Sequence, residues 1–139
     1  MLNKKRAFLF SLFLYLSSFI IYTILFVLPF SFFSPDNSQA LRNYVFTWVV
    51  NIPIVLLLAK WYFKKATASV QHGFRLGCVA IIFAIVFDAL FMLITVLAGQ
   101  SIDQVALFSD WKPFVTLVEI IALTTIAGGE FDKTYSATM

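Results

Sequence analysis

The sequence predicts an all-α integral membrane protein, a four-helix bundle formed by a single domain that spans residues 1–139. Three observations lead to this fold class. Of the 139 residues, 61% are apolar and only 12% are charged, whereas a soluble domain is typically about one quarter charged. The mean hydropathy is +0.92. The chain also contains four apolar runs close to the roughly 20 residues that a helix needs to cross a bilayer.

The four predicted spans cover about residues 7–30, 44–63, 76–98 and 113–127. Turn-forming residues follow the first run, which ends at Pro29 and a Ser-Pro-Asp-Asn-Ser stretch at 34–38. The fourth run is short, and we expect Gly128-Gly129 to stop it.

The first run also has features of a cleaved signal peptide. It begins with Lys4, Lys5 and Arg6, and Ser38-Gln39-Ala40 loosely resembles a cleavage site. However, its apolar stretch exceeds the roughly 7 to 15 residues of a signal-peptide core. We therefore expect the first run to be retained as a transmembrane helix.

The basic residues predict the orientation of the chain in the membrane. Eight of the ten Lys and Arg fall beside the same ends of the four runs, namely Lys4, Lys5, Arg6, Lys60, Lys64, Lys65, Arg75 and Lys133. Only Arg42 and Lys112 fall at the other ends. Because cytoplasmic loops of membrane proteins carry an excess of Lys and Arg, this predicts a cell-membrane protein with both termini in the cytoplasm (N-in/C-in). The basic residues flank the spans instead of forming one face, so the expected partner is the lipid bilayer and not nucleic acid.

Helices in lipid pack through small and polar side chains, because the hydrophobic effect does not drive them together. Each predicted helix has one stripe of such residues at helical spacing. In the third helix, Gly73, Gly77 and Ala84 form a stripe that we expect to pack against other helices, and Asp88 continues it. The stripes of the other helices are Ser11, Tyr15, Ser18 and Tyr22; Tyr44, Thr47 and Asn51, with a possible kink at Pro53; and Thr116, Glu119 and Leu123.

Asp88 and Glu119 are the most informative of these polar residues. A carboxylate at membrane depth costs at least ~2.5 kcal/mol, so such a residue is a functional-site hypothesis. Counting at about 1.5 Å per residue places Tyr22, Asn51, Asp88 and Glu119 at roughly similar depth, where they could form one ligand- or ion-binding layer. Three interpretations remain open: hydrogen bonds between helices, a proton- or cation-linked site, or a Glu119 that lies near enough to the interface to reach water.

The sequence contains no enzyme signature. We find no histidine within a span, no His and carboxylate at metal-ligand spacing, no phosphate-binding glycine loop and no nucleophile elbow. We therefore expect no catalytic activity, no cofactor and no metal site. The leading hypothesis is a membrane protein whose polar layer binds a proton, a small cation or a small solute, as a homo-oligomer. The alternative is an accessory or assembly subunit that docks on a larger membrane partner through the third helix.

Overall fold

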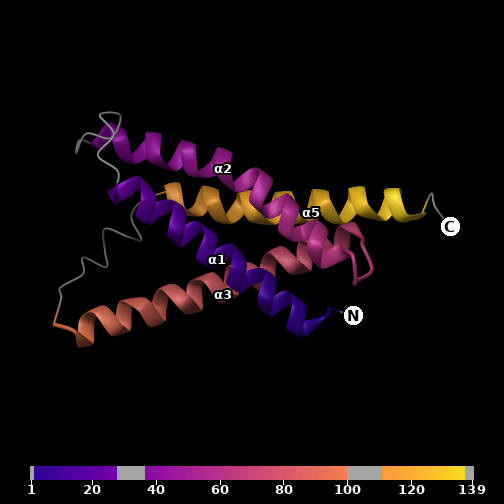
Figure 1. Cartoon of the computed structure of the whole chain (residues 1–139), viewed down its shortest axis with the longest axis horizontal. Helices are drawn as coiled ribbons and strands as arrows, with labels where there is room; N and C mark the ends of the chain where they lie inside the picture. Colours follow the sequence, from indigo (N-terminus) through magenta and orange to yellow (C-terminus); the bar gives the residue numbers. More distant parts are fainter. Residues whose placement is uncertain (1, 28–36, 100–110, 137–139) are drawn as a thin grey trace.

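The computed structural model describes the backbone of residues 2–27, 37–99 and 111–136, and their side chains except those at 22, 25–27, 37–41, 43 and 132–136. These residues form four helices, α1 (Lys4–Val27), α2 (Asn37–Phe63), α3 (Val70–Leu97) and α5 (Lys112–Ser136) (Figure 1). The described part of the chain is therefore all-helical, as predicted.

Three of the helices are long and apolar enough to cross a membrane. The qualifying segments are Tyr44–Phe63 of α2, Val70–Leu97 of α3 and Lys112–Phe131 of α5. They coincide closely with the last three predicted spans and are compatible with a membrane protein. The predicted first span, 7–30, coincides with α1 as far as residue 27, and its last three residues lie outside the described residues.

Three helix boundaries differ from those expected, the first being the start of α2 at Asn37 and not near residue 44. Ser69 caps the start of α3 by accepting a hydrogen bond from the backbone N–H of His72 (3.1 Å), so this helix begins before the predicted span. The expectation that Gly128-Gly129 stops the last helix is wrong, because α5 continues through both glycines to Ser136. A Cβ on Gly128 would collide with the carbonyl oxygen of Ser69, so this glycine permits a close helix contact and does not form a turn.

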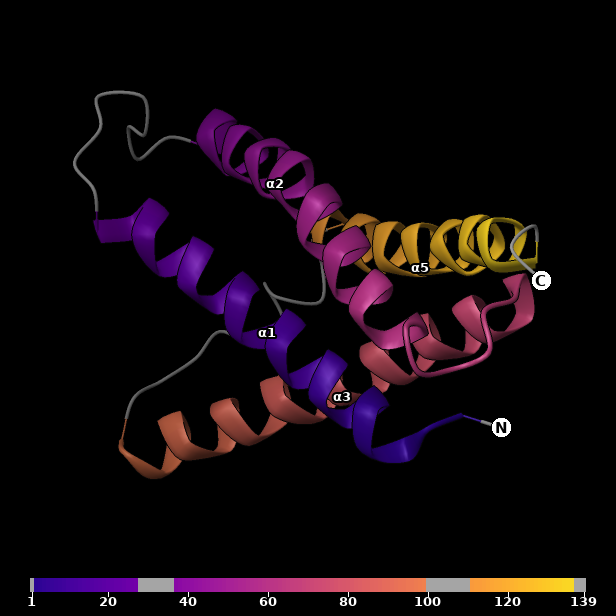
Figure 2. The same ribbon diagram turned by 45° about the vertical axis from the view of Figure 1, so that its right-hand side comes forward.

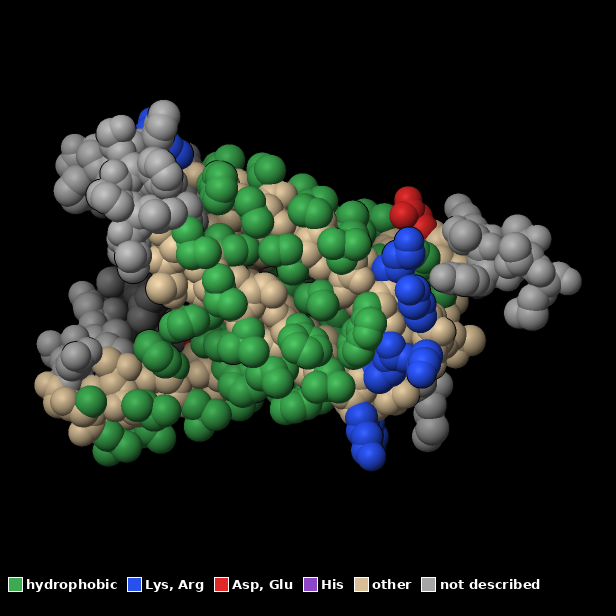
Figure 3. Space-filling model, viewed as in Figure 1, with side chains coloured by type: hydrophobic (Ala, Val, Ile, Leu, Met, Phe, Trp, Pro, Cys, Tyr) green, Lys and Arg blue, Asp and Glu red, His purple; other side chains and the backbone are tan. Residues whose placement is uncertain are grey.

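Consecutive helices run in opposite directions, so α1 is parallel to α3 and α2 is parallel to α5 (Figure 2). The end of the molecule that carries the start of α1, the end of α2, the start of α3 and the end of α5 is called the basic end, because most Lys and Arg side chains lie there. Figure 3 shows them as a band across the molecule, next to a broad apolar surface. The start of α1 and the end of α5, which are the first and last described helix ends, both lie at the basic end (Figure 1).

Within each parallel pair, contacts between side chains join the two helices along their length. In α1 and α3, Phe8 packs on Phe83 with ring centroids 5.3 Å apart, and Phe19 packs on Phe91 at 6.3 Å. In α2 and α5, Trp48 donates a hydrogen bond from Nε1 to the hydroxyl of Thr116, 68 residues later (2.9 Å). Phe63 and Phe131, also 68 residues apart, have their rings 6.2 Å apart. The pair α2–α5 therefore keeps one register over at least four turns.

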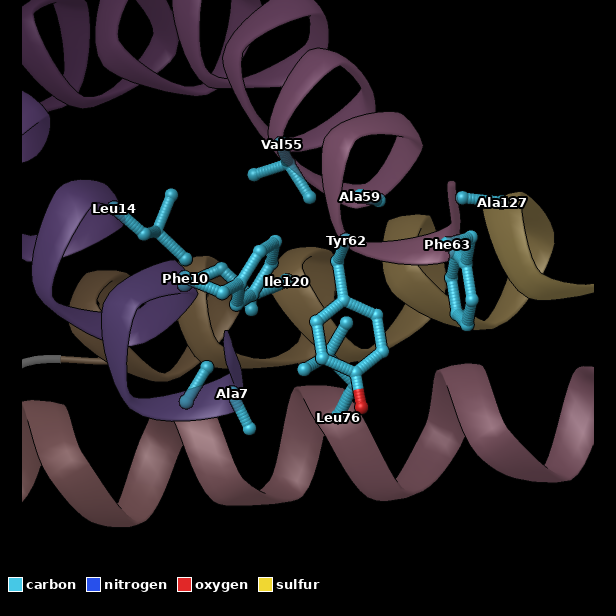
Figure 4. Packing of buried hydrophobic residues seen from close by; sticks show 11 residues of the cluster. Ala7, Phe10, Leu14, Val55, Ala59, Tyr62, Phe63, Leu76, Ile120 and Ala127 are labelled. Atoms are coloured by element: carbon cyan, nitrogen blue, oxygen red, sulfur yellow. The ribbon is translucent and has the colours of Figure 1, made fainter. Parts of the chain in front are cut away.

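The buried residues lie toward the basic end. Tyr62 of α2 is completely buried and packs edge-to-face on Phe10 of α1 (Figure 4). In the described part of α1 no residue after Leu14 is buried, and in α3 none after Ala80. Figure 2 shows the helices spreading apart toward the opposite end. The buried apolar cluster consists of Ala7, Phe10, Leu14, Val55, Ala59, Tyr62, Phe63, Leu76, Ala80, Ile120 and Ala127.

Candidate functional site

Asn51 and Glu119 face each other across the contact between α2 and α5. Asn51 lies on the buried stripe of α2, between Thr47 and Val55, and is 1% exposed. Glu119 is half-buried on α5. Since each residue lies three positions after a member of the Trp48–Thr116 hydrogen bond, the common register of the two helices places them opposite each other, about one turn closer to the basic end. Sequence depth alone predicts both residues but not this pairing.

The pair is close but its hydrogen bonds are not satisfied. The two side chains are near enough to interact, yet Oδ1 and Nδ2 of Asn51 and Oε2 of Glu119 are buried with no hydrogen-bond partner in the described residues. The contact between the two side chains is therefore at most a weak hydrogen bond, which leaves these three atoms unsatisfied. A buried polar atom without a partner costs about 1–3 kcal/mol. Asn51 and Glu119 thus form a polar site with hydrogen-bonding atoms that no neighbouring described residue satisfies.

Chemically, this arrangement suits a small positively charged ligand. A proton on Oε2 of Glu119 would turn that atom into a donor, and Oδ1 of Asn51 is the nearby acceptor that could receive it. A cation would instead use the carboxylate and amide oxygens together, because hard cations prefer oxygen ligands. Within the described residues, no group of three or more His, Cys, Asp and Glu side chains converges as a metal site would require.

Asp88 lies in a different contact, between α3 and α1. Its Oδ1 accepts a hydrogen bond from the Tyr15 hydroxyl (2.8 Å), and the Tyr15 ring packs on Phe87 at 5.1 Å. Asp88 itself is exposed. Of the four residues expected at one depth, only Asn51 and Glu119 are thus shown to pair, and Asp88 lies at a different helix contact with Tyr15, because depth counting does not fix the direction in which each residue points. The fourth residue, Tyr22, belongs to α1, but its side chain lies outside the described residues.

The small residues expected at helix contacts take different positions. Gly73 and Gly77 are buried where α3 crosses α5. A Cβ on Gly73 would collide with the backbone carbonyl of Thr124, and one on Gly77 would lie 2.9 Å from Cα of Ile121. Ala84 is half-buried.

Sequence analysis missed the residues of α5 that meet these glycines. Thr124 is completely buried and donates a hydrogen bond to the backbone carbonyl of Ile120 (2.8 Å), so its hydroxyl is satisfied within its own helix. Thr124 and Gly128 are four residues apart, the same spacing of small residues as Gly73 and Gly77. That spacing could have identified them, but Gly128 was interpreted as a helix stop.

No protein-family model, curated protein or solved structure matches this chain. Its function is therefore argued from the geometry of the polar pairs and the distribution of charge.

Proposed function

We propose that this chain is a non-enzymatic, multi-pass integral membrane protein that binds a proton or a small cation at Asn51 and Glu119. The observation that carries the proposal is the set of three buried, unpartnered polar atoms of the two side chains. Such atoms are costly in a low-dielectric interior, and a proton or cation held by the two oxygens, Oδ1 of Asn51 and Oε2 of Glu119, offsets part of that cost. Glu119 is the group that holds the charge, and Asn51 supplies the neutral oxygen.

The membrane part of the proposal is supported by three helices of spanning length. We propose that α1 crosses the cell membrane as a fourth span and that the basic end lies in the cytoplasm, with both termini. The charge distribution supports this orientation, since positive residues are retained on the cytoplasmic side. On this topology, Asp88 lies about 15 Å from the end of α3, well within the hydrocarbon core.

We further propose that the protein acts as a homo-oligomer. Asp88 is exposed and has one hydrogen bond, from Tyr15. A carboxyl group at this depth faces a bundle interior or a water-filled cavity, not lipid. A second copy of the chain packed on the face formed by α1 and α3 would shield Asp88 from lipid.

A second candidate function is that of an accessory subunit of a larger membrane protein. It is favoured by the half of α3 farthest from the basic end, where large apolar side chains such as Ile94 (64% exposed) and Leu97 (78% exposed) have no cover within the chain. On this alternative, Asp88 and Glu119 only form hydrogen bonds between helices, and α3 contacts the partner.

Thermal stability in lipid nanodiscs tests the proposed site. The parent protein is melted between about pH 5 and 9, with and without sodium or potassium, beside Glu119→Gln. The amide keeps the size of the acid but cannot hold a proton or charge. A ligand at 100 times its dissociation constant stabilises by about 2.7 kcal/mol, so we expect melting of the parent to depend on pH or cation and that of the variant to depend on neither.

The matched control is Glu130→Gln, which changes an exposed carboxylate on the same helix. It should retain the dependence of the parent. Identical curves for the parent and Glu119→Gln under every condition would reject the site and favour the accessory role.

A further inference from the structure

The basic end carries many more positive charges than the described residues neutralise. Its exposed basic side chains come from the start of α1, the end of α2 and the start of α3 (Figure 3). Glu130 near the end of α5 is a carboxylate at the same end, but within the described residues the following basic side chains outnumber it. The basic cluster consists of Lys4, Lys5, Arg6, Lys60, Lys64, Lys65 and Arg75.

Arg6 is the member of the basic cluster that the fold holds in place. One of its terminal nitrogens donates a hydrogen bond to the backbone carbonyl of Trp61 (2.7 Å), and its guanidinium carbon lies 4.4 Å from the centroid of a Trp61 ring. The backbone N–H of Asn3 donates to the Tyr62 hydroxyl (3.2 Å), which ties the segment before Arg6 to α2. The Arg6 side chain is therefore fixed where α1 meets α2.

The hydrogen bonds of Arg6 are incomplete. Its Nε is buried and has no partner among the described residues. Guanidinium groups bind the oxygens of phosphate groups through paired hydrogen bonds, and neighbouring lysines add charge without fixed geometry. Because Nε is buried, a phosphate would contact the outer part of the guanidinium group, and a partly exposed Arg held in place beside exposed lysines has the chemistry of a phosphate-binding site.

We propose that the basic cluster binds the headgroup of an anionic phospholipid, with Arg6 as its central contact. Trp61, which is partly exposed, lies beside Arg6, and tryptophan side chains occupy the headgroup level of membranes. Exposed apolar residues follow within one or two turns, including Phe8 (42% exposed) and Leu57 (67% exposed). A lipid whose phosphate reaches Arg6 can therefore lay its acyl chains along α1 and α2. Clusters of basic residues at the end of a transmembrane helix attract the anionic lipids of the cytoplasmic leaflet.

Thermal melting of the purified chain in neutral detergent micelles tests this proposal. Phosphatidylglycerol or phosphatidylcholine with the same acyl chains is added, and inorganic phosphate is tested in a third series. We expect phosphatidylglycerol to raise the melting temperature by several degrees more than phosphatidylcholine does, and inorganic phosphate to produce no such rise. About 0.5 M NaCl should reduce the difference, because salt screens exposed charges.

Substitutions locate the effect. Arg6→Gln should remove most of the extra rise, whereas Arg42→Gln, an exposed arginine at the opposite end, should retain it. If Arg6→Gln does not fold, the triple variant Lys4→Gln, Lys5→Gln, Lys64→Gln provides the same test, because all three side chains are exposed. Equal shifts with both lipids, an undiminished shift in the variants, or a shift reproduced by inorganic phosphate would each overturn the proposal.

This inference shares membrane insertion with the proposed function, but not the Asn51–Glu119 site. Glu119→Gln should keep its response to phosphatidylglycerol. If melting of the parent protein does not depend on pH or cations but still responds to phosphatidylglycerol, only the proposed function is rejected. If melting depends on pH or cations but does not respond to phosphatidylglycerol, only the lipid site is rejected.

Discussion

At the scale of single residues, the carboxyl groups of Asp88 and Glu119 have different surroundings because their partners differ. Asp88 accepts a hydrogen bond from Tyr15, so one of its acceptor sites is used in holding α1 to α3. Glu119 faces the Asn51 amide, but their contact leaves Oε2 of Glu119 and both polar atoms of the amide unsatisfied. The contact of Asp88 with Tyr15 is typical of a structural role, whereas the contact of Glu119 with Asn51 leaves polar atoms that a ligand could bind.

The hydrogen bond from Tyr15 to Asp88 should contribute little to stability. Such bonds between membrane helices average ~0.6 kcal/mol, so Tyr15→Phe should lower the free energy of unfolding by about that amount. The measurement is reversible unfolding in mixed micelles. Ser17→Ala is the control, because the Ser17 hydroxyl bonds only to the backbone of its own helix at Phe13 (2.7 Å). A Tyr15→Phe loss no larger than that of Ser17→Ala would show that the bond contributes nothing.

The Asn51–Glu119 pair should behave in the opposite way when both polar groups are removed. Replacing two buried, poorly satisfied polar groups by apolar ones of similar volume is often neutral or stabilising. We therefore expect the double variant Asn51→Leu, Glu119→Met to be at least as stable as the parent in the absence of ligand. Unfolding of both proteins in the same micelles measures this. A loss beyond ~1 kcal/mol would show that the pair stabilises the bundle directly and would favour the accessory role.

These residues show how far sequence reasoning reaches. Asn51, Asp88 and Glu119 could be selected because charged and amide side chains are rare within apolar spans, and rarity is visible in the sequence. Their partners could not be predicted, since the choice between Asn51 and Asp88 as the neighbour of Glu119 depends on the rotation and register of each helix. Trp48 and Thr116 are 68 residues apart, as are Asn51 and Glu119. This shared offset results from how α2 and α5 pack and cannot be predicted from local sequence.

At the scale of helices, the crossing of α3 and α5 is the closest contact in the molecule. Gly73 and Gly77 on one side and Gly128 on the other bring the two backbones together, so that Cα of Gly73 lies 3.1 Å from where a Cβ on Gly128 would be. Without a hydrophobic driving force in lipid, such close packing supplies the attraction between helices. Sequence analysis selected Gly73 and Gly77 on the α3 side of this contact. It failed for the α5 side because glycine has two roles, as a turn former and as a contact surface, and local sequence does not decide between them.

Enlarging Gly77 should disrupt this crossing. A Cβ there would lie only 2.9 Å from Cα of Ile121, a backbone atom that cannot move away cheaply. Gly77→Leu should therefore destabilise the protein by about 1–3 kcal/mol or prevent folding, as overpacking does elsewhere. Ala89→Leu is the matched control, since it enlarges an exposed small residue of the same helix. Thermal stability and the monodisperse fraction in detergent are the measurements, and equal behaviour of the two variants would remove the case for a tight crossing.

At the scale of the whole molecule, two parallel helix pairs are packed together at the basic end and spread apart at the other (Figure 2). The aromatic core around Tyr62 and the glycine contacts both lie near the basic end, and both polar pairs lie farther from it than Tyr62 does. The lengths and positions of the apolar segments could be predicted because spanning length is a local property of the chain. The spreading could not, because it depends on which side chains meet across pairs of helices.

The last prediction concerns the orientation of this molecule in the membrane. If all four helices cross and the basic end is cytoplasmic, reporters placed after Met139 and near His72 should both report cytoplasm, while insertions near Asn37 and Gln104 should report the outside. Fusions to a fluorescent protein and to a phosphatase that is active only outside the cytoplasm give complementary signals at each position. The structure already places the start of α3 and the end of α5 at one end of the molecule (Figure 1), so these two reporters must agree if the fold is correct. Cytoplasmic signals from a reporter at the N-terminus and from one near Asn37 would show that α1 does not cross, whereas cytoplasmic signals at both Asn37 and His72 would show that α2 does not cross. An external signal after Met139 with a cytoplasmic one near His72 would contradict the arrangement of α3 and α5.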